Sequence, residues 1–167
     1  HELSGGMRQR AMIALALACS PKLLLADEPT TALDATVQIQ ILLLLRQLQR
    51  ELGMSIIFVT HDVGVATEIA DELAVMYAGK IVEIGDVADV IKKPAHPYTQ
   101  GLLSSTVNSG SKGKRLEVIG GSPPDMSKLF KGCAFSPRCK KVLDQCWHQQ
   151  PAPESLSTSQ IASCFNI

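Results

Sequence analysis

The chain contains 167 residues, of which 46% are hydrophobic and 19% are charged. This length fits one domain, or one domain with an appended segment. Sixteen basic and sixteen acidic residues cancel, which argues against a nucleic-acid-binding surface. The longest apolar runs, 11–19 and 41–45, are much shorter than the ~20 residues that cross a bilayer. Composition and charge therefore favour a globular protein without a membrane span.

Helical and strand patterns alternate in the first part of the chain. The expected elements are a helix at 7–19, a strand at 23–26, a helix at 36–52, a strand at 55–60, a helix at 63–70, and two strands at 73–77 and 81–84 joined by a turn. Pro21 and Gly53 end the first two helices. The apolar runs of the first two strands are typical of strands buried on both faces of a parallel sheet. This alternation predicts an α/β fold.

The composition changes near residue 106. Residues 107–114 are polar and linker-like. Beyond Gly120 there are five prolines and four of the five cysteines, but little sustained periodicity. A segment with so small a hydrophobic core usually needs disulfides or a bound metal ion to be stable. The fifth cysteine, Cys19, falls on the first predicted helix and is expected to lie in the core.

Two adjacent carboxylates, Asp27 and Glu28, follow the first predicted strand. A strand of an open α/β sheet delivers the residue at its carboxyl end to the ligand crevice. Mg²⁺ takes oxygen ligands and keeps several waters, so Asp27 is a candidate magnesium ligand. Glu28 is a candidate for polarising an attacking water. The alternative is that the two acids only cap the junction between a strand and a turn.

Two further features suit phosphate chemistry. His61 follows the second predicted strand, where an imidazole can reach a phosphate or position a water. A hydrogen-bonded loop histidine is the alternative. Ser4, Gly5 and Gly6 precede a helix, whose free N–H groups and positive end favour an anion. An ordinary serine N-cap is the alternative there.

Four motifs in this order resemble the nucleotide-binding subunits of ABC transporters. Residues 3–9 resemble the signature loop with its Leu-Ser-Gly-Gly stretch, 23–28 the Walker B strand, 31–34 the D-loop, and His61 the switch histidine. This resemblance covers about residues 1–90. It implies that this region is the C-terminal part of a P-loop NTPase domain of the ABC type.

The resemblance also implies roles for single residues. Asp27 would coordinate Mg²⁺, Glu28 would act as the catalytic base, and His61 would sense the γ-phosphate. The residues implied to contact ATP held mainly by an opposite subunit, or to couple the two sites, are Ser4, Gly5, Gly6, Gln9 and Asp34. ATP and Mg²⁺ are the implied cofactors. Hydrolysis would take place at the interface between two chains, where positioning and charge stabilisation carry phosphoryl transfer.

The sequence departs from the family in one respect. It contains no Gly-x-x-x-x-Gly-Lys-Ser/Thr phosphate loop, and residues 110–114 have the wrong spacing and no preceding strand. In the family, this Walker A loop lies upstream of the signature. Because the chain also begins at His1 without an initiator Met, we expect it to be a C-terminal piece of a longer protein. The piece alone should not hydrolyse ATP, whereas the full-length protein should.

The segment 96–98 (His-Pro-Tyr) is a turn that leads into a helix, with Pro97 near its first position. It resembles the motif that opens the C-terminal extension of oligopeptide and dipeptide importer ATPases. Residues 7–10 and 27–34 also resemble that subfamily, so the resemblance extends over essentially the whole chain. It implies a partial ABC ATPase domain at 1–92 and a C-terminal extension with a four-cysteine site at 93–167.

The tail cysteines are spaced C-x5-C-x6-C-x17-C, at Cys133, Cys139, Cys146 and Cys164. Disulfides are disfavoured for a transporter ATPase in the reducing cytosol. Four thiolates suit tetrahedral Zn²⁺, although the short C-x2–4-C knuckles are missing. They also suit a 4Fe–4S cluster. The stretch 132–139 (Gly-Cys-x-Phe-x-Pro-Arg-Cys) resembles a subfamily tail associated with a 4Fe–4S site, which favours the cluster. Unligated thiols remain the third alternative.

The resemblance implies an energy-coupling ATPase subunit of a bacterial oligopeptide or dipeptide importer. The implied partners are a second, homologous ATPase chain in a heterodimer, two membrane permease subunits and an extracytoplasmic peptide-binding protein, with no nucleic acid. The subunit would lie peripherally on the cytoplasmic face of the inner membrane. The alternatives are an importer of nickel or another small solute, and a non-transport ABC ATPase.

Overall fold

The computed structural model of the chain describes residues 2–105 and 118–167. The chain forms two compact units, unit 1 (His1–Ile69) and unit 2 (Ala70–Ile167). The predicted linker at 107–114 lies outside the described residues. In the part of the chain that is described, no helix has both the length and the apolar character needed to cross a membrane.

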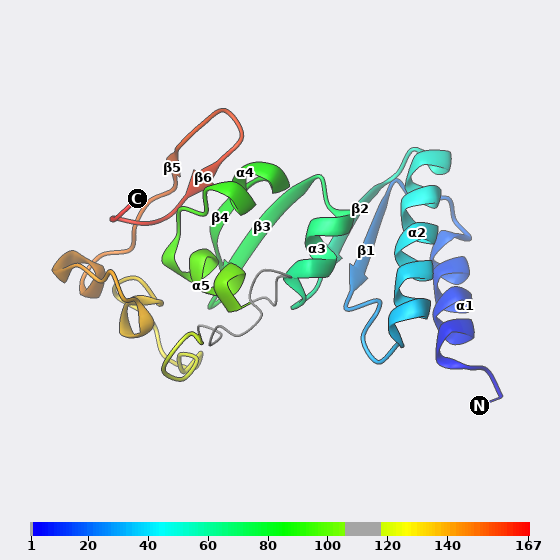
Figure 1. Cartoon of the computed structure of the whole chain (residues 1–167), viewed down its shortest axis with the longest axis horizontal. Coiled ribbons are helices and arrows are strands. Elements are labelled where there is room, and N and C mark those ends of the chain that lie inside the picture. Colours follow the sequence, from blue (N-terminus) through cyan, green and yellow to red (C-terminus); the bar gives the residue numbers. More distant parts are fainter. Residues whose placement is uncertain (1, 106–117) are drawn as a thin grey trace, which may run out of the picture. The chain divides into compact units, whose positions relative to one another are not determined.

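Unit 1 alternates helices and strands, as the sequence predicts (Figure 1). Its elements are α1 (Gly5–Leu17), β1 (Leu23–Asp27), α2 (Ala35–Leu52), β2 (Ser55–Val59) and α3 (Val63–Ile69). β1 and β2 run parallel, and Asp27 is paired with Val59 at their carboxyl ends. The segments that follow the two strands therefore start at the same edge of the sheet.

Short polar side chains begin the two long helices of unit 1. Ser4 accepts a hydrogen bond from the backbone three residues on at 3.3 Å, and Asp34 accepts the equivalent bond at 2.9 Å. α2 ends at Gly53 in the left-handed conformation (φ 61°). α1 ends at Leu17, and Cys19 is exposed. The predicted core position of Cys19 is wrong, because the residue follows the helix and does not share its buried face.

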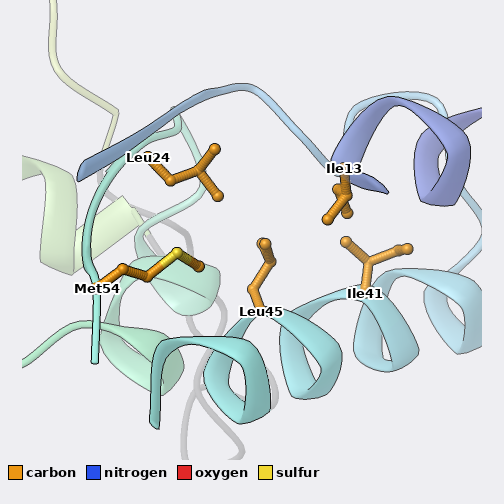
Figure 2. Close-up of a cluster of buried hydrophobic side chains, with 5 residues drawn as sticks. All are labelled: Ile13, Leu24, Ile41, Leu45 and Met54. Atoms are coloured by element: carbon orange, nitrogen blue, oxygen red, sulfur yellow. The ribbon is translucent and has the colours of Figure 1, made fainter. Parts of the chain in front are cut away.

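The core of unit 1 combines apolar side chains from α1, β1, α2 and the residue before β2: Ile13, Leu24, Ile41, Leu45 and Met54. Figure 2 shows these five side chains pointing toward one another. Ile41 and Leu45 are four residues apart on one helical face and are almost fully buried. The predicted burial of β1 and β2 on both faces is wrong in the described residues, since Leu25 is 68% exposed and Ile57 52% exposed. There, the apolar core covers only the opposite face of the strand pair.

Unit 2 is built on an antiparallel sheet with the strand order β3-β4-β6-β5. Its elements are β3 (Glu72–Tyr77), β4 (Lys80–Asp86), α4 (Val87–Lys92), α5 (Pro97–Ser105), the 3₁₀ helices η2 (Ser136–Arg138) and η3 (Asp144–Trp147), β5 (Glu154–Ser155) and β6 (Ile161–Ala162). The predicted hairpin between β3 and β4 is confirmed. Ala78 and Gly79 both have positive φ, as a tight type I′ turn requires.

An aromatic cluster forms the core of unit 2. The Phe135 ring lies 5.1 Å from that of Tyr77 and 5.4 Å from that of Tyr98, between ring centroids. Arg138 donates to the Gly120 carbonyl at 2.8 Å, and its guanidinium lies 6.0 Å from the Tyr77 ring centroid. The cysteine-bearing tail therefore packs on the β3–β4 hairpin. Units 1 and 2 divide between Ile69 and Ala70. The predicted domain boundary at 92/93 separates the ABC ATPase motifs from the C-terminal extension, and it stays a prediction.

A buried carboxylate joins distant segments of unit 2. Glu83, on β4, is 1% exposed. Its oxygens accept hydrogen bonds from Ala95 N at 2.8 Å, His96 N at 2.9 Å and Gln160 Nε2 at 2.8 Å. These bonds satisfy the buried acid and fix the segment before α5 and the loop before β6 against the sheet.

Candidate functional site

The carboxyl ends of β1 and β2 position Glu28. Its backbone N–H donates to the Val59 carbonyl at 2.9 Å, which extends the pairing of the two strands by one residue. Glu28 then adopts φ 47°, and Thr31 N donates to its carbonyl at 3.1 Å. This turn directs the chain away from the sheet directly after the strand. A non-glycine residue in the left-handed region is a feature that clusters at functional sites.

Glu28 is paired with His61, which follows β2. His61 Nδ1 lies 2.7 Å from Glu28 Oε1, and the His61 backbone N–H donates to the same oxygen at 3.2 Å. Both side chains are solvent-accessible. The parallel register brings the two residues together, because each lies just beyond the end of its strand.

The pair shifts the titration of both groups. Hydrogen bonds from Thr31 and then from His61 lower the pKa of the Glu28 carboxyl. The Glu28 carboxylate raises the pKa of His61, and the charge of Asp62 adds to this effect. Each partner stabilises the charged form of the other. The ion pair is therefore complete between the lowered pKa of Glu28 and the raised pKa of His61, and is lost as the pH falls below the first or rises above the second.

Asp27 is the last residue of β1 and is exposed. It lies at the same sheet edge as the Glu28–His61 pair, where the sequence predicts an oxygen ligand for Mg²⁺. Two neighbouring acids and an imidazole at one edge are able to hold a hydrated cation and orient a water molecule. The magnesium role of Asp27 stays a prediction.

The predicted signature residues lie at the beginning of α1. Ser4 caps the helix and Gln9 is half-buried on it. A Cβ on Gly6 would come within 2.7 Å of Val37 Cγ1 on α2, so glycine permits the close approach of the two helices. Gly5 lies against Leu33, which precedes α2, and Gly6 lies against Val37 in its first turn. Asp34 caps the same end of α2. These residues form a second group in unit 1, and their nucleotide roles stay predictions.

The four tail cysteines converge on one small cavity in unit 2. Cys133, Cys139, Cys146 and Cys164 line it together with His96 and Phe135. All four thiols are free of disulfides. Burial raises the pKa of Cys133, Cys139 and Cys164, and the neighbouring thiols raise it further. Four thiols around one cavity are a suitable donor set for a metal centre.

The backbone holds two of these cysteines in place. Cys133 N donates to the Cys146 carbonyl at 2.8 Å. The preceding residue is Gly132, and a Cβ there would collide with the backbone of Cys146 and Trp147. Across 2–105 and 118–167, no group of three or more His, Cys, Asp or Glu side chains has the arrangement of a metal site. The structure therefore supports the convergence of the thiols and does not support a bound 4Fe–4S cluster or Zn²⁺.

His96 also borders this cavity. It is 1% exposed, and burial lowers its pKa to about 4, so the imidazole is neutral at neutral pH. Tyr98 N donates to His96 Nδ1 at 3.0 Å, which places the ring proton on Nε2. The sequence indicates His96 only as part of a turn motif. Its burial depends on contacts with Glu83 and with Phe135 of the tail, and residues so distant in the sequence give no local pattern that predicts it.

The fold of the chain is similar to the ATP-binding cassettes of ABC transporters. Residues 1–31 match the family model "ABC transporter". The structure of cbiO1 from Clostridium perfringens, part of the ABC transporter complex cbiONQ, aligns with 56% of this chain and 37% of its own, at 38% identity and a TM-score of 0.53. The ADP conformation of MJ1267, an ATP-binding cassette of an ABC transporter, aligns with 59% of this chain and 40% of its own, at 25% identity and a TM-score of 0.52. The predicted fold class, part of an ABC ATPase domain, is confirmed.

Further similarity is to proteins of oligopeptide and dipeptide transport. Residues 82–146 match the family model "Oligopeptide/dipeptide transporter, C-terminal region". Over 99% of its length, the chain is 50% identical to the oligopeptide transport ATP-binding protein OppD of Salmonella typhimurium and 49% identical to AppD of Bacillus subtilis. It covers 49% and 50% of these proteins, and so spans about half the length of the curated relatives it matches. The predicted resemblance to ATP-binding subunits of oligopeptide and dipeptide ABC transporters is confirmed.

Proposed function

We propose that the chain is the C-terminal part of an energy-coupling ATPase subunit of an oligopeptide or dipeptide importer. The observation that carries this proposal is the Glu28–His61 pair at the ends of two adjacent parallel strands. The relatives named for oligopeptide transport support peptides as the transported class.

The geometry suggests how the site acts on ATP. Glu28 orients and polarises the attacking water with the lone pairs that its two protein partners leave free. His61 Nδ1 is engaged with Glu28, so Nε2 is the ring nitrogen available to the γ-phosphate. Asp27 would hold Mg²⁺, which offsets the negative charge of the phosphates.

The signature residues serve the other side of an ATP site in this proposal. Backbone N–H groups at the beginning of α1, around Ser4, Gly5 and Gly6, face the γ-phosphate of ATP held mainly by the second subunit, with Gln9 beside them. Asp34 couples the two sites. ATP therefore lies between two homologous chains, which form a heterodimer, and hydrolysis at this interface drives transport.

The proposed assembly includes two membrane permease subunits and an extracytoplasmic peptide-binding protein. The ATPase subunit lies on the cytoplasmic face of the bacterial inner membrane as a peripheral protein. Closure of the two ATPase chains on ATP and their reopening after hydrolysis would move the permeases between their two access states.

The proposal is tested by measuring ATP hydrolysis in two forms of the protein. The full-length protein with its partner ATPase chain is expected to hydrolyse ATP in the presence of Mg²⁺. Residues 1–167 alone are expected to show no turnover above background, because they lack the Walker A loop. Inactivity of the complete complex would overturn the ATPase assignment, and turnover by residues 1–167 would reveal a phosphate site outside the motifs above.

We also propose that the four cysteines hold a 4Fe–4S cluster, with Zn²⁺ as the alternative. The support for this proposal is that four free thiols line one cavity. Binding would have to draw their sulfur atoms into the arrangement of a metal site, which the described residues do not have. A bound metal would organise the tail through Cys133, Cys139, Cys146 and Cys164, and its role would be structural.

Metal analysis of the full-length protein distinguishes these outcomes. Anaerobically purified protein is expected to be brown, with broad visible absorption and bound iron and sulfide. Cys139→Ser is expected to lose the colour, because it removes one of four ligands. Cys19→Ser, which changes an exposed cysteine in unit 1, should keep it. A colourless protein with stoichiometric zinc would replace the cluster with zinc, and a metal-free protein would leave the thiols unligated.

A further inference from the structure

We propose that Thr31 is a positioning residue for hydrolysis, and that its hydroxyl holds the Glu28 carboxylate in the orientation that faces His61. The inference rests on the proposed ATPase function. The resemblance places Thr31 in the D-loop but gives its side chain no role. The structure provides one through a direct contact with Glu28.

The two oxygens of the Glu28 carboxylate have different partners. Thr31 Oγ1 donates to Oε2 at 2.5 Å. Oε1 receives the His61 backbone N–H and lies 2.7 Å from His61 Nδ1. The terminal torsion of a glutamate side chain is broad and only weakly restrained by itself. With a separate partner on each oxygen, the plane of the carboxylate is fixed from both sides.

The backbone keeps Thr31 within reach of Glu28. Thr31 N donates to the Glu28 carbonyl at 3.1 Å, which closes a turn over residues 28–31. Thr30, inside this turn, is buried, and its carbonyl accepts from Leu33 N at 3.3 Å. Glu28 itself is anchored to β2 through Val59. The hydroxyl is thus presented by a turn that is held at both ends.

The contact has a geometric consequence for the carboxylate. Oε1 is engaged by two nitrogens of His61, the backbone N and Nδ1, whereas Oε2 receives only the Thr31 hydroxyl. A further lone pair of Oε2 therefore remains available to a water molecule. Thr31 fixes the direction in which this lone pair points.

A matched pair of variants in the full-length ATPase complex tests this role. Thr31→Val keeps the shape of the side chain and removes the hydroxyl, and kcat is expected to fall about 10-fold. The KM for ATP should not change, because Thr31 acts through Glu28. Thr31→Ser restores the hydroxyl and should restore kcat.

Two further measurements make the outcome decisive. Thr158→Val makes the same chemical change at an exposed position in unit 2 and should leave kcat unchanged. The ¹³C carboxyl shift of Glu28, recorded at one neutral pH in the full-length protein without ATP, should change in Thr31→Val and return in Thr31→Ser. That change would support the contact independently of turnover, so failure of the proposed ATPase function is distinguishable. Wild-type kcat and an unchanged Glu28 carboxyl shift in Thr31→Val, or a loss that Thr31→Ser does not rescue, would overturn the inference.

Discussion

Replacement of Glu28 by Gln in the full-length protein is expected to reduce ATP turnover by a factor of about 10² to 10⁴ while ATP binding persists. The substitution keeps the length of the side chain but removes its negative charge. Two donors, the Thr31 hydroxyl and the His61 backbone N–H, face the two oxygens of Glu28. The amide NH₂ of the substituted side chain would face one of these donors, which then loses its acceptor.

The prediction is measured by steady-state ATP hydrolysis together with ATP retained on the protein after rapid separation. Glu28→Gln should retain ATP without converting it. Glu154→Gln removes an exposed carboxylate from β5 in unit 2 and should leave turnover unchanged. If Glu28→Gln hydrolysed ATP at the wild-type rate, Glu28 would lose its place in the catalytic site.

Replacement of Glu83 by Ala is expected to destabilise unit 2 by about 3 kcal/mol or more. The carboxylate is almost fully buried and accepts three hydrogen bonds. Its removal leaves the backbone N–H groups of Ala95 and His96 without their buried acceptor. The side-chain nitrogen of Gln160 keeps its bond to the Lys93 carbonyl at 2.9 Å. Unpaired buried donors are costly because water does not replace the lost partner.

Thermal and denaturant unfolding of the full-length protein measures this loss. Glu154→Ala, at an exposed position of the same unit, should change the free energy of unfolding by less than about 0.5 kcal/mol. Glu83→Gln keeps one acceptor oxygen and should fall between the two variants. Wild-type stability in Glu83→Ala would show that solvent or a rearranged side chain satisfies these donors.

The arrangement of unit 1 could be predicted well because its signals are local. Two short apolar runs separated by a helical pattern indicate adjacent parallel strands, and polar residues directly after such strands meet at one edge. The sequence alone therefore places Glu28 and His61 at the same edge. It does not predict the contact of Thr31 with Glu28, since a threonine three residues after an acid has many possible conformations and only the strained turn fixes one.

Unit 2 is harder to predict because its contacts join distant segments. Glu83 lies within an apolar strand pattern, and its partners come from Ala95, His96 and Gln160, up to 77 residues away. The strands β5 and β6 have two residues each, too few for a periodic signal. Phe135 lies in a tail with little apolar periodicity, yet its side chain is only 3% exposed and packs on the Tyr77 ring. The count of cysteines indicates a shared site, but their spacing does not reveal the cavity.

The absence of a side chain at Gly132 has a consequence for sequence variation in this group of proteins. Every other amino acid would place an atom against the backbone of Cys146 and Trp147. The segments of chain that carry the first and third tail cysteines would then have to separate. Substitutions at this position should accordingly be found only in relatives whose tail cysteines no longer line a common cavity.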